Sequence, residues 1–590
     1  MPRLAASVQN SEVARLFDEV GDLLEILGEN PFRIRAYRNA ARTVRDFPEG
    51  IAEVVRRGER DLTELPSIGA DMAEKIRTIV TTGELPLHKE LCAKVPPGLL
   101  GLLRIPGLGP KRVKLLHSKL KITSAADLQK ALDGGRVAKL KGFGPKTEQQ
   151  MRAALGQKAT ETGPRRLLLF EAEEQAGALV KWLETGGGYE TLTVAGSYRR
   201  RRETIGDLDL LVTSDDPGKV IERFTSYSGA AKVISKGKIA AALELPSGLR
   251  ADLRALEPEA YGAGLLYFTG SKAHNIELRQ IAQARDLKLN EYGLFKGSKR
   301  VAGRTEAEIY EYLGLDFIPP ELREARGEIA LAREHRLPTL VELAEIKGDL
   351  QMHTTATDGR ATLEEMAAAA RKLGYEYIAI TDHSKRVSMA LGQDPARLRE
   401  QWAAIDAMNA RAKGFTILKS VEMDILENGK LDLPDDVLAE ADYVLATIHY
   451  GLNQSSEQLT RRLLGAIRHP FVDAIGHPTG RRLGRRERES SAVDFETVVR
   501  AAVECNCLLE IDGHPERMDL PDTLAAAAKR AGARFVLSTD SHAVNNLPFM
   551  RYAVDVARRA GLEAGDILNT RSLAEFRRGL KRARRGGSKR

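Results

Sequence analysis

One short segment constrains this 590-residue chain more than any other. Gly196 and Ser197 are followed by arginines, and Gly206 then precedes an apolar run that contains Asp207 and Asp209. Side chains alternate between the faces of a strand, so the two carboxylates would point to the same side. Adjacent carboxylates repel unless a cation lies between them, and Mg²⁺ accepts such oxygens together with phosphates. The pattern predicts a metal-dependent nucleotidyl transfer site; a solvated acidic strand end is the simpler alternative.

A third acid and an aromatic segment downstream support this interpretation. Asp252 lies in a second apolar run that is typical of a strand. The segment after it contains, in order, Tyr267, Phe268, Gly270, Asn275 and Arg279. Over roughly residues 10–320 these motifs, in their order and spacing, resemble the palm and thumb of the family X DNA polymerases.

This resemblance implies roles for individual side chains. Asp207, Asp209 and Asp252 would hold two Mg²⁺ ions, one acting on the primer 3′-hydroxyl and one on pyrophosphate. Ser197 and Arg200 would bind the triphosphate, the aromatic pair would pack under the sugar, and the polar pair after it would probe the nascent base pair. The full set implied to bind the deoxynucleoside triphosphate is Gly196, Ser197, Arg200, Gly206, Tyr267, Phe268, Gly270, Asn275 and Arg279.

A glycine-containing motif recurs three times in the first 155 residues, which read as largely helical. Its copies end at Gly69, Gly109 and Gly144, and each precedes a polar helix start. The motif resembles the helix-hairpin-helix element, in which a tight turn presents free helix amides to a DNA phosphate. The glycines predicted to contact DNA in this way are Gly69, Gly107, Gly109, Gly142 and Gly144. Ser67 stands where the first copy would usually have a glycine.

The first 90 residues also resemble the lyase domain of family X polymerases. Lys75, six residues after Gly69, occupies the position of the lyase nucleophile and would form a Schiff base with an abasic sugar if its pKa were lowered. An ordinary phosphate-contacting lysine is the alternative, because Phe32 and Arg33 replace a His-Lys pair of the family.

The pattern changes from Gly348 onward, where apolar strands alternate with long helices and strands end in acids and histidines. A barrel of parallel strands gathers such residues at its C-terminal face. These motifs resemble the PHP (polymerase and histidinol phosphatase) domain, a distorted seven-stranded barrel. By this resemblance the metal ligands are His353, Asp358, His383, Glu422, His449, His477, Asp540 and His542.

The ligand types imply the metals and the chemistry. A mixed set of histidines and carboxylates suits two or three Mn²⁺ or Zn²⁺ ions, and the implied reaction is phosphoester hydrolysis by metal-activated water. Gln351 replaces the first histidine of the family's His-x-His motif. An amide binds these metals more weakly than an imidazole, so one of the three metal positions is in doubt.

Composition excludes several other classes of protein. The chain has no run of 18 apolar residues, so we expect no membrane span. Three cysteines do not provide a secreted disulfide framework. The net charge of +8 equals the eight positive side chains between Arg577 and Arg590, which predicts a basic tail that either seeks phosphate or only solubilises the chain.

We therefore expect a multidomain fold: a helical N-terminal region, an α+β nucleotidyltransferase palm with a thumb, and an α/β PHP barrel. The predicted boundaries are 1–90 (lyase-like), 91–155 (helix-hairpin-helix), 156–258 (palm), 259–320 (thumb), 321–346 (linker), 347–575 (PHP) and 576–590 (basic tail).

The predicted function is a DNA-directed DNA polymerase that fills short gaps in base excision repair or end joining. The PHP domain would add a metal-dependent 3′-5′ exonuclease or a related phosphoesterase. The expected partners are gapped or primer-template DNA and deoxynucleoside triphosphates, for a monomer in the cytoplasm at the nucleoid. One alternative is an inert, structural PHP domain, for which Gln351 is the only support. Another is a hydrolase whose polymerase half only binds DNA, which the complete aspartate set argues against.

Overall fold

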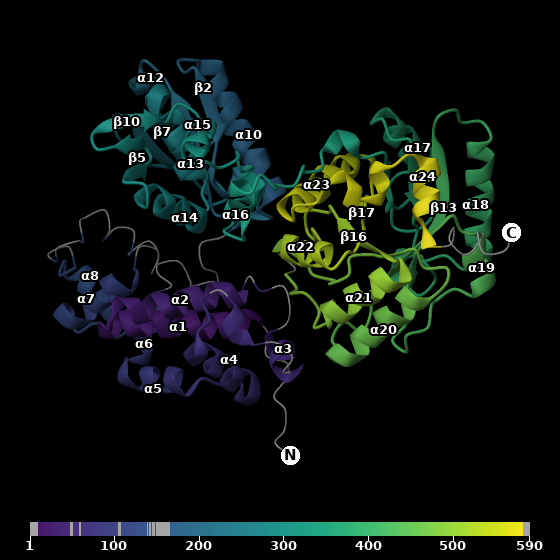
Figure 1. Cartoon of the computed structure of the whole chain (residues 1–590), viewed down its shortest axis with the longest axis horizontal. Coiled ribbons are helices and arrows are strands. Elements are labelled where there is room, and N and C mark those ends of the chain that lie inside the picture. Colours follow the sequence, from purple (N-terminus) through teal and green to yellow (C-terminus); the bar gives the residue numbers. More distant parts are fainter. Residues whose placement is uncertain are drawn as a thin grey trace. The chain divides into compact units, whose positions relative to one another are not determined.

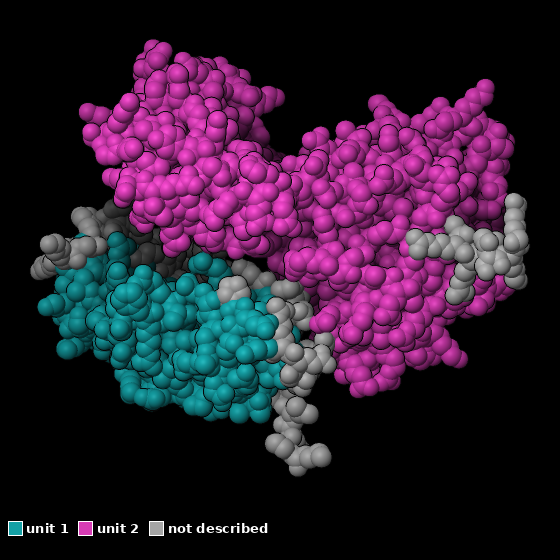
Figure 2. Space-filling view, in the orientation of Figure 1, with its two compact units in different colours: residues 1–165 teal, residues 166–590 magenta. Residues whose placement is uncertain are grey.

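The computed structural model describes residues 10–45, 47, 51–57, 61–65, 67–103, 108–137, 140, 143, 148, 151, 166–484 and 487–581. The chain divides into two compact units, residues 1–165 and residues 166–590 (Figure 2). No helix within the described ranges is both long enough and apolar enough to cross a bilayer. The predicted thumb and barrel belong to the second unit, as does the predicted palm from residue 166 onward.

The first unit contains only helices among its described regular elements, as the sequence predicts. Apolar side chains of its first two helices form the centre of the core, where the rings of Phe17 and Tyr37 meet edge to face at 5.8 Å. The α-helices are α1 (Asn10–Leu27), α2 (Pro31–Arg45), α3 (Ile51–Arg57), α4 (Ala70–Thr82), α5 (Pro86–Lys94), α6 (Pro97–Leu102), α7 (Pro110–Leu120) and α8 (Ala125–Asp133).

The palm is a five-stranded sheet in the order β2-β4-β7-β6-β5. Its central neighbours β4 and β7 are parallel, and the other pairs are antiparallel. The strands are β2 (Thr191–Val194), β4 (Asp207–Thr213), β5 (Lys232–Lys236), β6 (Ala240–Glu244) and β7 (Arg250–Leu256). A short pair, β1 (Leu167–Leu168) with β3 (Thr204–Ile205), joins helices α10 (Leu169–Gly186), α11 (Gly196–Arg199) and α12 (Pro217–Thr225) in completing the palm.

The thumb follows as helices around a three-stranded antiparallel sheet in the order β10-β9-β8. Its elements are α13 (Tyr261–Thr269), α14 (Lys272–Gln283), β8 (Leu287–Asn290), β9 (Gly293–Lys296), β10 (Lys299–Ala302) and α15 (Glu306–Tyr312). The predicted linker contains α16 (Glu328–Arg333) and short 3-10 turns.

The C-terminal domain is a seven-stranded parallel sheet whose strands pair in sequence order, from β11 to β17. A bridge between Met352 and Ser541 joins the chain just beyond its first and last strands, so the sheet is a nearly closed barrel, as predicted. The strands are β11 (Gly348–Asp349), β12 (Tyr377–Ile380), β13 (Thr416–Asp424), β14 (Tyr443–Thr447), β15 (Ala474–Ile475), β16 (Leu508–Asp512) and β17 (Phe535–Ser538).

Helices lie outside these strands (Figure 1). They are α17 (Leu363–Lys372), α18 (Pro395–Asn409), α19 (Asp435–Glu440), α20 (Ser456–Arg468), α21 (Phe495–Cys505), α22 (Asp522–Arg530) and α23 (Met550–Arg559). Alternate strand residues such as Tyr377 and Leu418 point into the barrel and form a separate apolar core. The interior is therefore packed, and functional groups are confined to the strand ends.

The folded barrel extends beyond its predicted end at residue 575. Helix α24 (Leu573–Gly579) inserts Phe576 into the barrel core, 5.0 Å from the ring of Tyr377. Lys581 is buried, and its ammonium donates to the carbonyls of Ile467 at 2.6 Å and His469 at 2.8 Å. The first positive residues of the predicted tail thus belong to the folded domain, and residues 582–590 lie outside the described residues.

Candidate active sites

The three palm carboxylates share one face of the sheet. Leu208 and Leu210 pack in the same core as α10 and α12. Strand alternation therefore turns Asp207 and Asp209 to the opposite face. β7 lies beside β4 in a register that pairs Asp252 with Asp209. The sheet brings together the acids that the sequence singled out.

The electrostatics of this cluster favour a bound cation. Burial, together with the negative charges of Asp207 and Asp252, raises the pKa of Asp209 to about 7. Arg250 donates to both oxygens of Asp252, at 2.5 and 2.6 Å, and supplies part of the missing positive charge. Divalent ions would remove the remaining repulsion, so these residues fit the predicted Mg²⁺ site.

The predicted phosphate-binding turn passes directly over the acids. Gly196 has a φ of +64°, and a Cβ at this position would lie 2.6 Å from Oδ2 of Asp209. Only glycine fits there, because any other side chain would collide with the carboxylate. Ser197 follows in the single turn of α11. At Gly206 a Cβ would lie 2.9 Å from Nη1 of Arg166, so this backbone is also closely covered.

Arg200 ends the same turn. Its Nε donates to Glu324 at 3.1 Å, and its Nη1 donates to the carbonyl of Thr269. The sequence assigns the Arg200 side chain to the triphosphate, and in this structure that side chain is hydrogen-bonded to the carboxylate of Glu324 instead.

The predicted sugar- and base-contacting residues form one connected group. The rings of Tyr267 and Phe268 meet edge to face at 5.1 Å, and Tyr267 is 41% exposed. Asn275 donates to the carbonyl of Tyr267 at 2.7 Å, and Arg279 donates to the carbonyl of Asn275 at 3.1 Å. Gly270, with a φ of +69°, makes the turn between α13 and α14. The group is assembled, and its contacts with a nucleotide remain predictions.

Two helix-hairpin-helix glycines start helices, as the motif requires. Gly69 and Gly109 cap the N-termini of α4 and α7, and a Cβ at either would have no atom within 4 Å among the described residues. The helix starts are therefore open. Ser67 takes the left-handed conformation, with a φ of 63°, that the usual glycine would provide. Gly107, Gly142 and Gly144 lie outside the described residues.

Lys75 lies on α4, one turn after Asp71, with which it forms an ion pair. Its ammonium is 6.0 Å from the ring centre of Tyr37. This ion pair is compatible with a phosphate-contacting lysine and with a resting lyase nucleophile. Its role stays a prediction.

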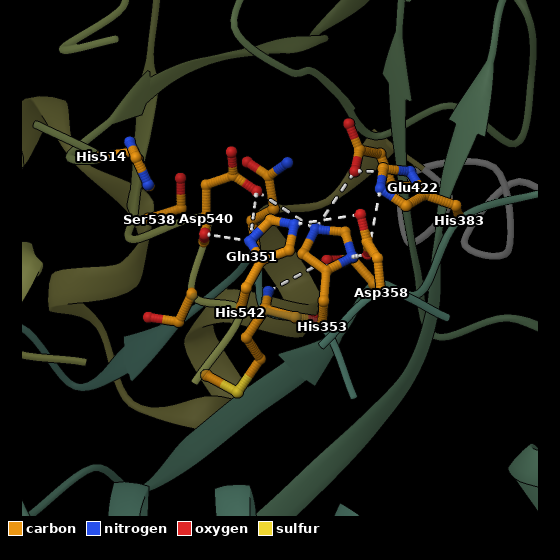
Figure 3. Close-up of polar contacts among 12 residues, drawn as sticks. Gln351, His353, Asp358, His383, Glu422, His514, Ser538, Asp540 and His542 are labelled. Atoms are coloured by element: carbon orange, nitrogen blue, oxygen red, sulfur yellow. Dashed lines mark hydrogen bonds and ion pairs between the residues drawn. The ribbon is translucent and has the colours of Figure 1, made fainter. Parts of the chain in front are cut away.

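All eight predicted PHP ligands meet at the C-terminal end of the barrel strands. Figure 3 shows His353, His383, His542, Asp358, Glu422 and Asp540 pointing toward one another. They form three overlapping groups: His353, Asp358, His383 and His542; His383, Glu422 and His449; and His353, Glu422 and Asp540. His477 joins the second group, with its Nε2 2.9 Å from Oε1 of Glu422. The arrangement is that of a cluster in which Glu422 and two histidines are shared.

The buried histidine nitrogens fit bound metal ions. Both ring nitrogens of His353, Nδ1 of His383 and Nδ1 of His477 are buried and make no hydrogen bond to any described residue. Buried polar atoms rarely lack a partner, and metal coordination is a common reason when carboxylates surround them. Glu422 and Asp540 lie 3.3 and 3.2 Å from Nε2 of His353. The donor set is suitable for Mn²⁺ or Zn²⁺.

Gln351 is fully buried and has a partner of its own. With its amide nitrogen directed at Glu510, it donates to both carboxylate oxygens, at 2.6 and 3.1 Å. Glu510 also accepts from Ser538 at 2.5 Å and from the backbone of His477 at 2.6 Å. The residue that replaces the family's histidine therefore stabilises a buried acid beside the ligands.

The sequence analysis missed Glu510 and several further acids around the ligands. Asp512 lies with Glu510 on β16, and burial raises the pKa of both carboxyls well above the usual range. Arg517 lies 3.2 Å from Asp540, and Asp424 accepts from the backbone of His449 at 2.9 Å. The run Leu-Leu-Glu-Ile-Asp has the same alternation that identified Glu422, so this signal was available in the sequence.

Six of the eight predicted ligands line a cavity of about 700 Å³ that is open to solvent: Asp358, His383, Glu422, His449, Asp540 and His542. Its wall also contains positive and aromatic side chains, namely Arg360, Arg482, Arg517 and Tyr450. A negatively charged phosphoester could thus approach the ligands over positive groups.

A carboxylate-lined palm joined to a barrel with a histidine-rich candidate metal site is typical of one class: a nucleotidyltransferase fused to a metal-dependent phosphoesterase. Family models match four stretches of the chain. They describe a helix-hairpin-helix domain (residues 8–85), a SAM-like helix-hairpin-helix tandem (99–157), a DNA polymerase beta thumb (264–324) and a PHP domain (349–546).

Relatives of known name resemble either the whole chain or the barrel alone. A DNA polymerase/3′-5′ exonuclease PolX from Bacillus subtilis is 36% identical over 579 residues, which are 98% of this chain and 100% of the relative. A probable phosphatase from a Thermoanaerobacter species is 30% identical over 38% of this chain and 90% of the relative. One from Acetivibrio thermocellus is 30% identical over 33% of this chain and 78% of the relative. The chain belongs to the family X DNA polymerases that carry a C-terminal PHP domain.

Proposed function

We propose that the palm extends primer 3′ ends in gapped or primer-template DNA, using deoxynucleoside triphosphates. The observation that carries this proposal is the shared face of Asp207, Asp209 and Asp252 on paired strands, under a turn that only glycine fits at position 196. Two bound Mg²⁺ ions would activate the primer hydroxyl and compensate the charge of the pyrophosphate. Ser197 and Arg200 would orient the triphosphate, and the Tyr267–Phe268 pair would support its sugar.

The preferred substrate is a short gap. The open starts of α4 and α7 offer two helix N-termini to DNA phosphates, and such contacts hold a duplex without reading its sequence. We expect faster extension on a one-nucleotide gap with a 5′-phosphate than on an open primer-template. Equal turnover on the two substrates in steady-state assays would refute this preference. Short-gap filling in base excision repair or end joining, by a monomer at the nucleoid, is the corresponding cellular role.

We further propose that the barrel hydrolyses phosphoesters at DNA ends, as a 3′-5′ exonuclease or a related phosphoesterase. Mn²⁺ or Zn²⁺ bound by the eight ligands would supply hydrolytic water at neutral pH and compensate the phosphate charge. The positive side chains of the cavity wall would orient the phosphate, and the buried acids on β16 would hold the ligand loops. An inert barrel is less well supported, because Nδ1 of His477 would then be buried without a hydrogen bond to any described residue.

One experiment tests both activities. The purified chain is incubated with a labelled, gapped duplex in Mg²⁺ and in Mn²⁺, with and without nucleotides. We expect extended products with nucleotides and shortened products without them. Absence of extension would refute the palm proposal, and absence of any end hydrolysis in Mn²⁺ would refute the barrel proposal.

A further inference from the structure

The turn that carries Ser197 and Arg200 is hydrogen-bonded to helix α23 of the barrel. Arg559 donates from Nη1 to the backbone carbonyl of Arg200 at 2.6 Å. One turn earlier on α23, Asp555 accepts from Nε and Nη2 of Arg201, at 2.9 and 2.7 Å. Residues four apart lie on the same helix face, so α23 presents a donor and an acceptor to consecutive residues of the turn.

A second barrel segment holds the end of the same turn. Arg481, which follows β15, donates from Nη2 to Glu203 at 2.9 Å. The turn therefore has three attachments to the barrel over four residues. Arg201 also donates from Nη2 to Glu173 of the palm helix α10, at 2.6 Å. Charge-assisted bonds of this kind, at low exposure, fix geometry more strongly than exposed ones.

Arg559 also contacts Glu324, the carboxylate that accepts from the Arg200 side chain. Arg559 is 5% exposed, and its Nη1 lies 3.1 Å from Oε1 of Glu324, the oxygen that also accepts from Arg200. Its Nη2 donates to Asp522 at 2.6 Å, which fixes the guanidinium on the barrel side. Two guanidiniums thus share one carboxylate between the palm and the barrel.

The Glu324 carboxylate stays charged whether or not Arg200 binds it. Burial alone would raise the pKa of Glu324, but the positive charges of Arg559 and Arg200 outweigh it and lower the pKa to about 2. Glu324 is thus a carboxylate at neutral pH, and a buried charge is costly without a partner. If the Arg200 side chain moves from Glu324 to a phosphate, Arg559 remains as the partner of Glu324. The free energy needed to break the Arg200–Glu324 contact is therefore lower than it would be without Arg559.

We propose that Arg559, together with Asp555, is a positioning residue for nucleotide addition: the barrel holds the triphosphate-binding turn of the palm and frees Arg200 for the nucleotide. This inference rests on the proposed function of the palm. It assigns the barrel a role in polymerisation that is independent of its own metal ligands.

The test uses the full chain with Arg559→Ala and Asp555→Asn. The second variant keeps the side-chain shape and removes the charge of one of the two carboxylates that bind Arg201, the other being Glu173. We expect Arg559→Ala to raise the KM for the deoxynucleoside triphosphate about ten- to a hundredfold, because small displacements of positioning groups cost this much. The affinity for gapped DNA and the Mn²⁺-dependent end hydrolysis should not change, and Arg559→Lys should restore part of the nucleotide affinity.

The matched control is Arg558→Ala on the same helix. Arg558 donates to Glu321 at 2.8 Å and to the carbonyl of Val341 at 3.0 Å, and among the described residues it makes no hydrogen bond or ion pair with the turn. The Arg558→Ala variant loses one positive charge, as Arg559→Ala does. Its KM for the nucleotide should stay within about twofold of the parent value, as expected when no interaction with substrate is lost.

Equilibrium binding of an α,β-imido deoxynucleoside triphosphate in Mg²⁺ provides a readout that needs no catalysis. A parent protein that binds this analogue but extends no primer would refute the palm proposal and leave the positioning inference testable by affinity. Unchanged analogue affinity and unchanged KM in both Arg559→Ala and Asp555→Asn, with hydrolysis intact, would overturn the inference. An effect of Arg558→Ala as large as that of Arg559→Ala would also overturn it, since the loss would then follow from the interface in general.

Discussion

The palm and the barrel present metal-binding groups in two different ways. The palm offers three carboxylates on a sheet face, with Asp207 exposed and Asp252 paired to Arg250. The barrel offers eight predicted ligands, and four nitrogens of its buried histidines make no hydrogen bond to any described residue. The palm site is therefore one that substrate oxygens would complete, whereas the barrel site is assembled in advance.

This difference has a physical cause. A sheet face can only place acids at alternate positions of neighbouring strands, which leaves room for DNA and a nucleotide above it. A parallel barrel brings the ends of all its strands to one rim, so ligands far apart in sequence surround the same point. The following predictions test whether the two sites work independently and differ in this way.

The largest effect should come from Asp209→Ala. Asp209 follows Asp207 on the same face of β4 and pairs with Asp252 on β7, so its loss should lower nucleotide addition at least about a hundredfold. Binding of gapped DNA and Mn²⁺-dependent hydrolysis should persist. Single-nucleotide extension and a gel-shift assay measure these quantities, and retention of a tenth of the activity would remove Asp209 from the metal site.

The converse change is His383→Ala, which removes a ligand common to two of the three groups in the barrel. We expect hydrolysis of DNA ends to fall by about tenfold or more, the loss typical even of supporting groups at metal sites, while nucleotide addition is unchanged. Hydrolysis at the parent rate would mean that the activity has another source.

A third prediction concerns the retention of metal. Because its ligands are assembled without substrate, the barrel should keep about two equivalents of Mn²⁺ or Zn²⁺ after gel filtration, and His383→Ala should keep fewer. Asp209→Ala should have the same metal content as the parent. Elemental analysis decides the matter, and a drop in the Asp209 variant would show that the palm also holds tightly bound metal.

The smallest effect should come from Gln351→His. The imidazole restores the family's ligand pattern, so the metal content should rise toward three equivalents and hydrolysis should increase modestly. The same change removes the two amide bonds to Glu510, which limits the gain. Identical metal content and activity in the two proteins would mean that Gln351 already serves the site as well as a histidine.

Much of this architecture could be predicted from local patterns. The alternation around Asp209 and Glu422, the glycines before α4 and α7, and the histidines after the barrel strands each follow from a short-range rule of strand or helix geometry. Glu510 has a similar alternation on β16, so it too could be predicted from the sequence.

Other features depend on residues that are distant in sequence. The contact of Arg559 with the carbonyl of Arg200 spans 359 positions, and the burial of Lys581 depends on carbonyls 112 and 114 positions away. No periodicity or motif encodes such pairs. The sequence therefore predicts a basic tail over residues 576–590, although the first of these residues are folded. The sequence alone determined the family, the order of the domains and the two sets of acids and histidines, since these depend on local spacing. Only the tertiary structure decided that Gln351 is bonded to Glu510 and that the barrel holds the nucleotide-binding turn, because these depend on which surfaces pack together.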